Sequence, residues 1–476
     1  MPFPNHVRNH RIVESSNLFD ESNHMTTPND RRNFLVQGAA ATAGLFAARS
    51  AMGQQQDAFS TSEQQNADQS HDGYPRLHPG LGGPIGSATD RGKLVPGLGK
   101  TGQPPIGVVA PDLKTESGKI VNGAREFHLH ATPVRREVLP GIWMDAYGYN
   151  GQFPGPVLEM YQGERVRIIF KNDLPEATTL HSHGLELPIY MDGIPAVTQN
   201  LVKPGQTFVY EYDVHQEGSY FLHPHVAMQE AIGMVVPFII HPKVAFEPVV
   251  DRDFVLMTQQ FSMQPNTTIP DTTSMDWNFL TINGRCGPYT TPLVCKLGER
   301  VRIRFLNFST LHQHPMHLHG HTFWVTGTEG GRIPESAWIP GNTVIVGVAQ
   351  SRDVEFIANN PGDWVLHCHM FHHMMNHMVT QVGPIVRENK NQAGFEVPGF
   401  PQMMSSAKLT PEDIHKLTDR RETAGMREGW YHGVHGLFTV LRVLPPELYD
   451  KVMHTNEPIP PNSSTPFKPP AGSQPL

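Results

Sequence analysis

The sequence predicts an all-β chain that contains two consecutive β-sandwich domains of the Greek-key type. Three observations support this fold class. Gly and Pro number 43 each among 476 residues, which suits many short strands joined by turns. A strand-like segment and two histidine motifs each occur twice, in the same order. Segments such as 206–212 and 343–348 have the apolar patterns of strands.

The internal repeat sets the expected domain bounds. Residues 163–172 (GERVRIIFKN) return 135 positions later as residues 298–307 (GERVRIRFLN). The second copy alternates Val, Arg, Ile, Arg and Phe, which is the pattern of a half-buried strand. We therefore expect one domain at 120–245 and a homologous domain at 246–388.

The segments outside these domains have other compositions. In 1–53, the pair Arg31-Arg32 precedes a short run rich in Ala and Gly, which predicts a twin-arginine-type export signal and a periplasmic or secreted protein. Residues 54–119 form a low-complexity linker or arm. Residues 389–476 form a C-terminal extension in which Thr410, followed by Pro and two acids, starts a helix. The last residues, rich in Pro and Ser, are expected to be disordered.

Composition excludes several function classes. The net charge of −8 argues against a nucleic-acid binder that relies on a basic face. No run reaches the roughly 18 apolar residues of a membrane-spanning helix. Three cysteines exclude a disulfide scaffold, although Cys286 and Cys295 either pair in an oxidising compartment or remain buried thiols. The 27 histidines make metal binding the first function to test.

The histidines form four His-x-His pairs, two in each domain at matched offsets of 136 and 144 positions. Residues i and i+2 of a strand project from the same face, so each pair directs two imidazoles to one place. Neutral imidazoles suit Zn, Cu, Fe or Ni. The pairs are His181 and His183, His223 and His225, His317 and His319, and His367 and His369.

The surroundings of Cys368 favour copper among these metals. One thiolate, two imidazoles and a distant thioether make the His2Cys site with an axial Met that is typical of blue copper proteins. The set is His314, Cys368, His373 and Met378. A tetrahedral zinc site is the alternative, but it needs no Met and leaves the flanking histidines unexplained. We interpret His312 and His321 as structural.

These motifs, HxHG, HxH, HPxHLHGH and HCHxxxHxxxxM in that order, resemble those of the multicopper oxidases, the cupredoxin-fold family that includes laccases. The resemblance covers about 120–388 and implies four coppers per chain. By that resemblance, the type 2 copper is held by His181 and His317. The type 3 pair is held by His183, His223, His225, His319, His367 and His369. The type 1 copper is held by His314, Cys368, His373 and Met378.

The repeat offsets locate the first-domain counterparts of the four type 1 ligands. The counterparts are Thr178, Pro224, Gln229 and Met234, so three of the four ligands are lost. The first domain therefore supplies half of the trinuclear cluster and no type 1 copper. This pattern resembles the two-domain multicopper oxidases with type 1 copper in the second domain only. That resemblance implies a homotrimer with clusters at its subunit interfaces.

The implied reaction is the one-electron oxidation of a phenol, an aromatic amine or a low-valent metal ion, coupled to four-electron reduction of dioxygen to water. Asp192 takes the place of the acidic residue that family members use beside the cluster, although Asp-Gly is also a common turn. Two other functions are considered. A copper nitrite reductase would place type 1 copper in the first domain and use fewer histidines. A non-catalytic cupredoxin would have lost ligands, and none is missing.

Overall fold

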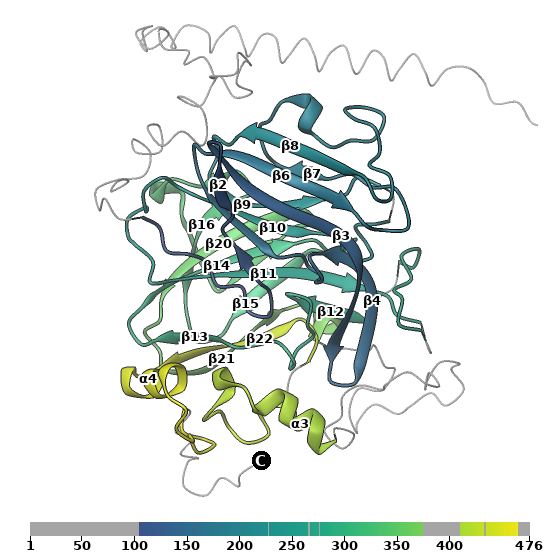
Figure 1. Cartoon of the computed structure of the whole chain (residues 1–476). Coiled ribbons are helices and arrows are strands. Elements are labelled where there is room, and N and C mark those ends of the chain that lie inside the picture. Colours follow the sequence, from purple (N-terminus) through teal and green to yellow (C-terminus); the bar gives the residue numbers. More distant parts are fainter. Residues whose placement is uncertain are drawn as a thin grey trace, which may run out of the picture. The chain divides into compact units, whose positions relative to one another are not determined.

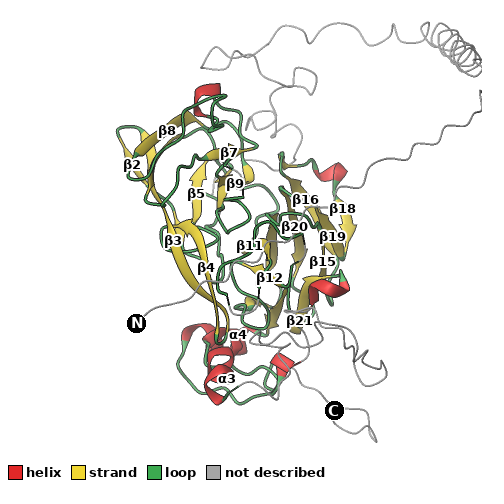
Figure 2. Cartoon of the chain, turned by 90° about the vertical axis from the view of Figure 1, so that its right-hand side faces the viewer, coloured by secondary structure: helices red, strands yellow, loops and turns green. Residues whose placement is uncertain are grey.

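The computed structural model describes residues 104–226, 228–264, 267–275, 277–374, 410–432 and 435–464. The predicted export signal and Met378 lie outside these ranges. Strands far outnumber helices in the described chain, and its two α-helices are α3 (Pro411–Thr418) and α4 (Pro446–His454) (Figures 1 and 2). The described residues contain no helix that is long and apolar enough to cross a membrane.

Two five-stranded sheets form the first domain, with a shared core between them. One has the order β1-β5-β10-β9-β7, and the other has the order β2-β3-β6-β8 with β4 paired to β3. The first sheet comprises β1 (Thr115–Glu116), β5 (Val157–Tyr161), β10 (Val236–His241), β9 (Gly218–His223) and β7 (His181–His183). The second comprises β2 (Lys119–Val121), β3 (Ala124–Leu139), β6 (Arg165–Asn172), β8 (Thr207–Asp213) and β4 (Ile142–Tyr149).

The second domain also has two sheets, ordered β12-β11-β14-β20-β16-β17, with β18 paired to β16, and β13-β22-β21-β15-β19. The first comprises β12 (Phe279–Ile282), β11 (Arg252–Phe261), β14 (Arg300–Asn307), β20 (Gln350–Ile357), β16 (Phe323–Thr328), β17 (Gly331–Arg332) and β18 (Ile339–Gly341). The second comprises β13 (Leu293–Lys296), β22 (Phe438–Leu444), β21 (Gly362–Cys368), β15 (His314–Leu318) and β19 (Thr343–Val346). The 3-10 turns are η1 (Ile189–Met191), η2 (Glu335–Ala337), η3 (Phe371–Met374), η5 (Arg421–Thr423) and η6 (Trp430–His432).

The two domains repeat the same strand pairing. Arg165 pairs with Asp213 between β6 and β8, and Arg300 pairs with Ile357 between β14 and β20. The residues of the second pair lie 135 and 144 positions after those of the first pair, and both offsets occur in the sequence repeat. The all-β fold class with two consecutive sandwiches is therefore confirmed. The strands expected at 206–212 and 343–348 are confirmed as β8 and β19.

Three arginines on β14 have different surroundings from those we expected. Arg302 and Arg304 are buried, so the prediction of a half-buried strand is wrong. Arg304 donates from Nε and Nη2 to the two carboxylate oxygens of Asp253, both at 2.8 Å. Glu355 accepts from both Arg300 and Arg302. Burial tends to raise the pKa of Asp253, but the two buried arginines outweigh it and lower that pKa.

The same ionic network joins the two domains. Arg304 also donates to Ser219 Oγ of β9 at 2.9 Å, and Ser219 Oγ donates to Asp353 on β20 at 2.8 Å. Around these contacts lies an apolar layer drawn from both domains, including Phe221 and Leu306. Strands β9 and β10 are consequently buried on both faces. The two domains thus pack against each other through a shared buried layer.

The chain beyond the second domain's predicted end returns to that domain. Residues 389–476 were expected to lie outside it, yet β22 fills an interior position between β13 and β21. The segment Phe438–Leu444 is apolar except for Thr439 and Arg442 and is buried throughout, which fits a central strand. The helix expected after Thr410 is confirmed as α3, and Thr410 and Asp413 form its capping box.

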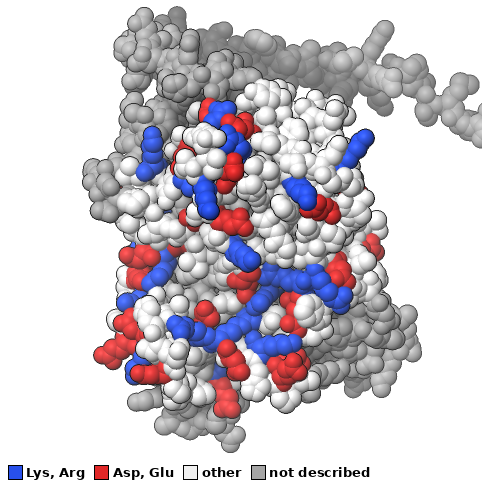
Figure 3. Space-filling model, in the orientation of Figure 1, with Lys and Arg blue, Asp and Glu red and all other residues white. Residues whose placement is uncertain are grey.

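Part of the expected linker at 54–119 is also ordered. In the described portion, β1 pairs with β5, and Val109 forms a bridge with Phe254 of the second domain. These pairings join residues too far apart in sequence to leave a local periodicity. On the face drawn in Figure 3, Lys and Arg are interspersed with Asp and Glu. That face accordingly carries no uniform basic area.

We predict that Glu355→Gln lowers the free energy of unfolding by about 3–5 kcal/mol, because Arg332 and Arg302 lose a buried carboxylate partner, although Arg302 keeps Asp253. The repeat supplies a matched control. Glu211 is the first-domain counterpart of Glu355 and pairs with arginines at a partly exposed position. Glu211→Gln should have a much smaller effect, because water screens the charges that remain. Denaturant unfolding of both variants checks this, and equal losses would contradict it.

Candidate metal centres

Cys368 ends β21 and lies beside two histidines from other segments. Its Sγ is 3.3 Å from His373 Nδ1 and 3.6 Å from His314 Nδ1, and the two nitrogens are 3.2 Å apart. Donors that lie about 2.0–2.3 Å from one ion are separated from one another by about 3–4 Å. All three residues are buried. We call this set the cysteine group, and its spacing fits a single metal ion.

Burial keeps the cysteine group uncharged. It lowers the pKa of His314 well below the usual range, and His373 and His312 add to the effect. Burial, with His312 and His372, lowers the pKa of His373 to about 4. Burial also raises the pKa of the Cys368 thiol to about 12. The imidazoles are therefore ready to bind a cation, while the thiol must lose a proton when a metal binds.

Two residues that we did not assign to the site contact its histidines. His312 Nδ1 is 2.7 Å from His373 Nε2, and Ser309 Oγ is 2.7 Å from His314 Nε2. Each contact uses the ring nitrogen that faces away from the cysteine group. His312 also lies edge-on to Trp277, with ring centroids 3.8 Å apart. Only the spacing of His312 from His314 could have indicated its role from sequence, and that signal is weak.

The first-domain counterparts of these ligands form a closed polar pair. Thr178 Oγ1 donates to Gln229 Oε1 at 2.7 Å, and both residues are buried. Met234 is also fully buried. Pro224 replaces the cysteine. This place in the first domain therefore has no thiolate or imidazole donors.

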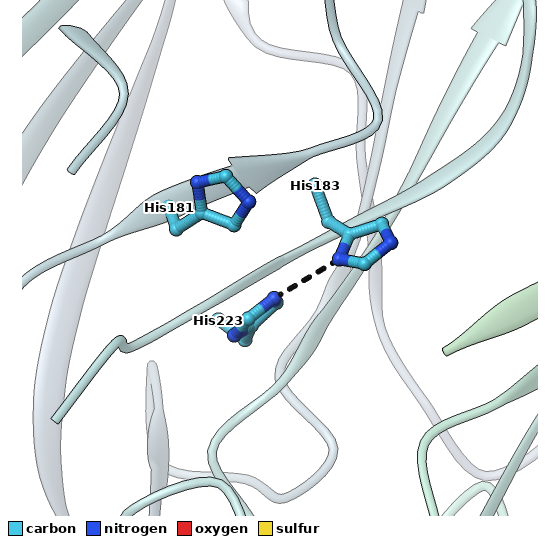
Figure 4. Close-up of side chains that lie close together, drawn as sticks. All are labelled: His181, His183 and His223. Atoms are coloured by element: carbon cyan, nitrogen blue, oxygen red, sulfur yellow. Dashed lines mark hydrogen bonds between the residues drawn. The ribbon is translucent and has the colours of Figure 1, made fainter. Parts of the chain in front are cut away.

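His181 and His183 of the edge strand β7 form a group with His223 at the end of β9 (Figure 4). We call it the first-domain histidine group. His183 Nδ1 and His223 Nε2 are 3.3 Å apart. Since a carbonyl oxygen only accepts, His181 Nδ1 donates to Asp192 O at 2.7 Å and His223 Nδ1 donates to Pro224 O at 2.8 Å. These bonds leave Nε2 of both rings with a lone pair for a metal.

His317, His319 and His367 form the matching second-domain histidine group. His319 Nε2 and His367 Nε2 are 3.1 Å apart. His317 Nδ1 donates to Asn342 O, and His367 Nδ1 donates to Cys368 O. The repeat thus conserves the backbone bonds that orient the rings as well as the histidines themselves. Burial lowers the pKa of His183 and of His367 to about 4, helped by neighbouring imidazoles.

The fourth histidine of each domain lies at the rim of its group. The His225 ring is 5.7 Å from that of His181, and the His369 ring is 5.4 Å from that of His317. Both residues are exposed. Among the described residues, no group of ligand atoms close enough to hold one metal ion combines histidines from the two domains. All eight predicted cluster histidines are therefore gathered into two separate halves.

Other predicted residues have the following positions. Asp192 follows η1, and its carboxylate Oδ1 is 3.3 Å from His181 Nδ1. Cys286, Cys295 and Cys368 are all free and buried. Cys286 and Cys295 belong to different core clusters, so they do not form a disulfide. Met378 lies outside the described residues.

Comparison with known families agrees with this donor set. Two models described as multicopper oxidase match residues 132–245 and 258–386, which together make up about half of the chain. The chain belongs to the multicopper oxidase family. Membership implies that the metal is copper, which suits the thiolate and imidazole donors of the cysteine group.

Several curated relatives align with parts of the chain. Multicopper oxidase MmcO of Mycobacterium tuberculosis is 27% identical over 45% of this chain and 48% of its own length. Copper resistance protein A of Escherichia coli is 36% identical over 26% of this chain and 20% of its own length. The chain thus spans less than half the length of these relatives. A solved blue copper oxidase from Nitrosomonas europaea is 28% identical, with a TM-score of 0.49 over 53% of this chain and 81% of that chain.

We predict that Cys368→Ser abolishes the blue charge-transfer absorption of the copper-loaded protein, because it removes the only thiol of the cysteine group. The histidine groups keep their donors, so copper with a type 2 paramagnetic resonance signal should remain. Absorption and electron paramagnetic resonance spectra measure both effects.

Cys295→Ser is the matched control, since Cys295 is a buried free thiol in the same core cluster. It should keep the blue colour. A blue Cys368→Ser protein would contradict the assignment.

Proposed function

We propose that this chain is an oxidase that removes single electrons from a reducing substrate and reduces dioxygen to water. Bound copper supplies the one-electron acceptor at the cysteine group and the four-electron reduction of dioxygen at a three-copper cluster. The proposed stoichiometry is four coppers per chain.

One observation carries this proposal. Cys368 belongs to the cysteine group, while its neighbour His367 belongs to the second-domain histidine group and His369 lies at the rim of that group. Adjacent strand residues point to opposite faces, so at the end of β21 Cys368 reaches the domain interior while His367 reaches the histidine group, and His369, directly after the strand, lies beside His317. The backbone therefore gives a short covalent route between the electron acceptor and the proposed oxygen site.

We also propose that three copies assemble into a ring. The first- and second-domain histidine groups remain separate within one chain. A contact between the first domain of one subunit and the second domain of the next would bring eight histidines together. Such a head-to-tail contact must close to avoid a filament. A homotrimer supplies that closure and holds a cluster at each interface.

A pocket of about 370 Å³ is proposed to admit the reductant. Ser309 lines it and contacts His314, so a bound molecule lies one residue away from the cysteine group. Phe308 and Leu311 offer apolar surface for a phenol or an aromatic amine. Met228, Met275 and Glu230 line the same pocket, and thioethers with a carboxylate suit Cu(I). These two classes of reductant are the ones to compare.

Asp192 is proposed as a proton donor near the cluster. Its backbone carbonyl orients His181, and its carboxylate lies beside the same ring with about a third of its side chain exposed. Contact with water would let it exchange protons with solvent. Export through the N-terminal segment, and with it a periplasmic or secreted location, is also part of the proposal.

The experiment that tests the activity is oxygen uptake by copper-loaded protein. A methoxyphenol and Cu(I) should each be supplied separately, and one of them should support uptake with four electrons consumed per dioxygen. Copper analysis should give four ions per chain. Peroxide as the end product, a single copper, or consumption of nitrite in place of dioxygen would contradict the proposal.

Subunit mixing tests the shared cluster. One variant carries His181→Ala and His183→Ala, and the other carries His317→Ala and His319→Ala. Each alone should be inactive, because every interface lacks two of its eight histidines. Random mixing should restore activity to about a quarter of the interfaces, those that combine two intact halves.

Refolded wild-type protein is the control for recovery. An active monomer by light scattering would refute the ring, as would mixtures that stay inactive while the wild type recovers.

A further inference from the structure

Comparison of the two domains shows which strand of the second domain corresponds to β10 of the first. In the first domain, β10 lies between β5 and β9. In the second domain, β22 lies between β13 and β21. β13 is related to β5, and β21 to β9, by the sequence repeat. β22 is therefore the second-domain counterpart of β10, although it comes from the C-terminal part of the chain.

The pairing register makes this correspondence residue by residue. Val236 pairs with Leu222 in the first domain, and Thr439 pairs with Leu366 in the second. Leu222 and Leu366 immediately precede the equivalent histidines His223 and His367. Val236 and Thr439 are therefore equivalent. The residues two positions earlier are Met234 and Leu437.

The parallel partners of the two strands give the same alignment. Phe238 pairs with Leu158, and Leu441 pairs with Leu293. Leu158 and Leu293 differ by the same 135 positions that separate the two copies of the repeated strand. The pairing with β5 and β13 is independent of the pairing with β9 and β21. It again places Leu437 where the first domain has Met234.

Backbone hydrogen bonds outside the sheets also support the equivalence of Met234 and Leu437. Met234 N donates to Gln229 O at 3.4 Å, and Leu437 N donates to His373 O at 2.8 Å. Gln229 is the counterpart of His373. The residue before each is a glycine with positive φ, Gly233 at 117° and Gly436 at 78°.

Leu437 also binds the cysteine group directly through its backbone. Its carbonyl accepts from Cys368 N at 3.0 Å. Its side chain is fully buried and belongs to the same core cluster as Cys368 and Met316. One residue thus bonds to the backbone of both Cys368 and His373.

We propose that Leu437 occupies the axial position of the type 1 copper site, the place that the His-x4-Met spacing assigns to Met378. This inference rests on the type 1 site of the proposed function. A leucine side chain has no donor atom, so the copper would be held by His314, Cys368 and His373 alone. The loss of an axial thioether and its replacement by hydrocarbon raise the reduction potential of such a site. The resulting site favours reductants that give up electrons less readily.

The decisive variant is Leu437→Met, which keeps side-chain volume and is well tolerated in cores. It should lower the type 1 reduction potential and change the copper hyperfine splitting and the blue absorption, because a thioether now reaches the copper. Met378→Leu should change none of these. Potentiometric titration and electron paramagnetic resonance measure them without reference to turnover.

Leu441→Met is the matched control, because Leu441 lies on β22, four residues after Leu437, in the same core cluster. It should leave the type 1 signals unchanged. If Leu437→Met leaves the potential and the spectra unchanged, or if Met378→Leu raises the potential, the axial assignment is wrong. A wild-type protein that binds copper without any blue absorption would instead overturn the type 1 site and the proposed function with it.

Discussion

Successive side chains of a strand point to opposite faces, and the proposed chemistry depends on that rule at the end of β21, where His367 and Cys368 are neighbours and His369 follows directly. Cys368 points into the core of the second domain, where it meets His314 and His373. His367 and His369 point to the edge, with ring centroids 5.4 Å apart. No loop or hinge intervenes between the two kinds of centre. The separation between electron entry and oxygen reduction is thus set by the geometry of a single strand.

The domain interface constrains the rest of the site. Arg304, Ser219 and Asp353 form buried hydrogen bonds across it, within an apolar layer drawn from both domains. Moving the domains apart would break both hydrogen bonds of Ser219 Oγ and expose this apolar layer to water, although Arg304 would keep its second-domain partners Asp253 and Asp353. The two histidine groups of one chain are therefore held in fixed, separate positions. A rigid pair of half-sites is well suited to completion by another subunit, because little conformational entropy is lost on docking.

The features that sequence predicted are those with a short period or a repeated spacing. Alternation along strands and the two offsets located both sandwiches, the two histidine groups and Cys368. The burial of Arg302 could not be predicted in this way, because it depends on Asp253 and Glu355, some fifty residues away on each side. The position of β22 was missed for the same reason. Its partner β21 precedes it by a long segment, and the spacing after His373 offered Met378 as a nearer match for the axial residue.

The contrast between the domains explains how one fold carries a cysteine group in only one of its two copies. Thr178 and Gln229 satisfy each other in the first domain, so that position is stable without any ion. In the second domain, burial keeps the imidazoles of His314 and His373 neutral and the thiol of Cys368 protonated. An uncharged set of donors costs far less to bury than an ionised one. The copper-free second domain can therefore fold before metal arrives, and binding then exchanges the thiol proton for copper.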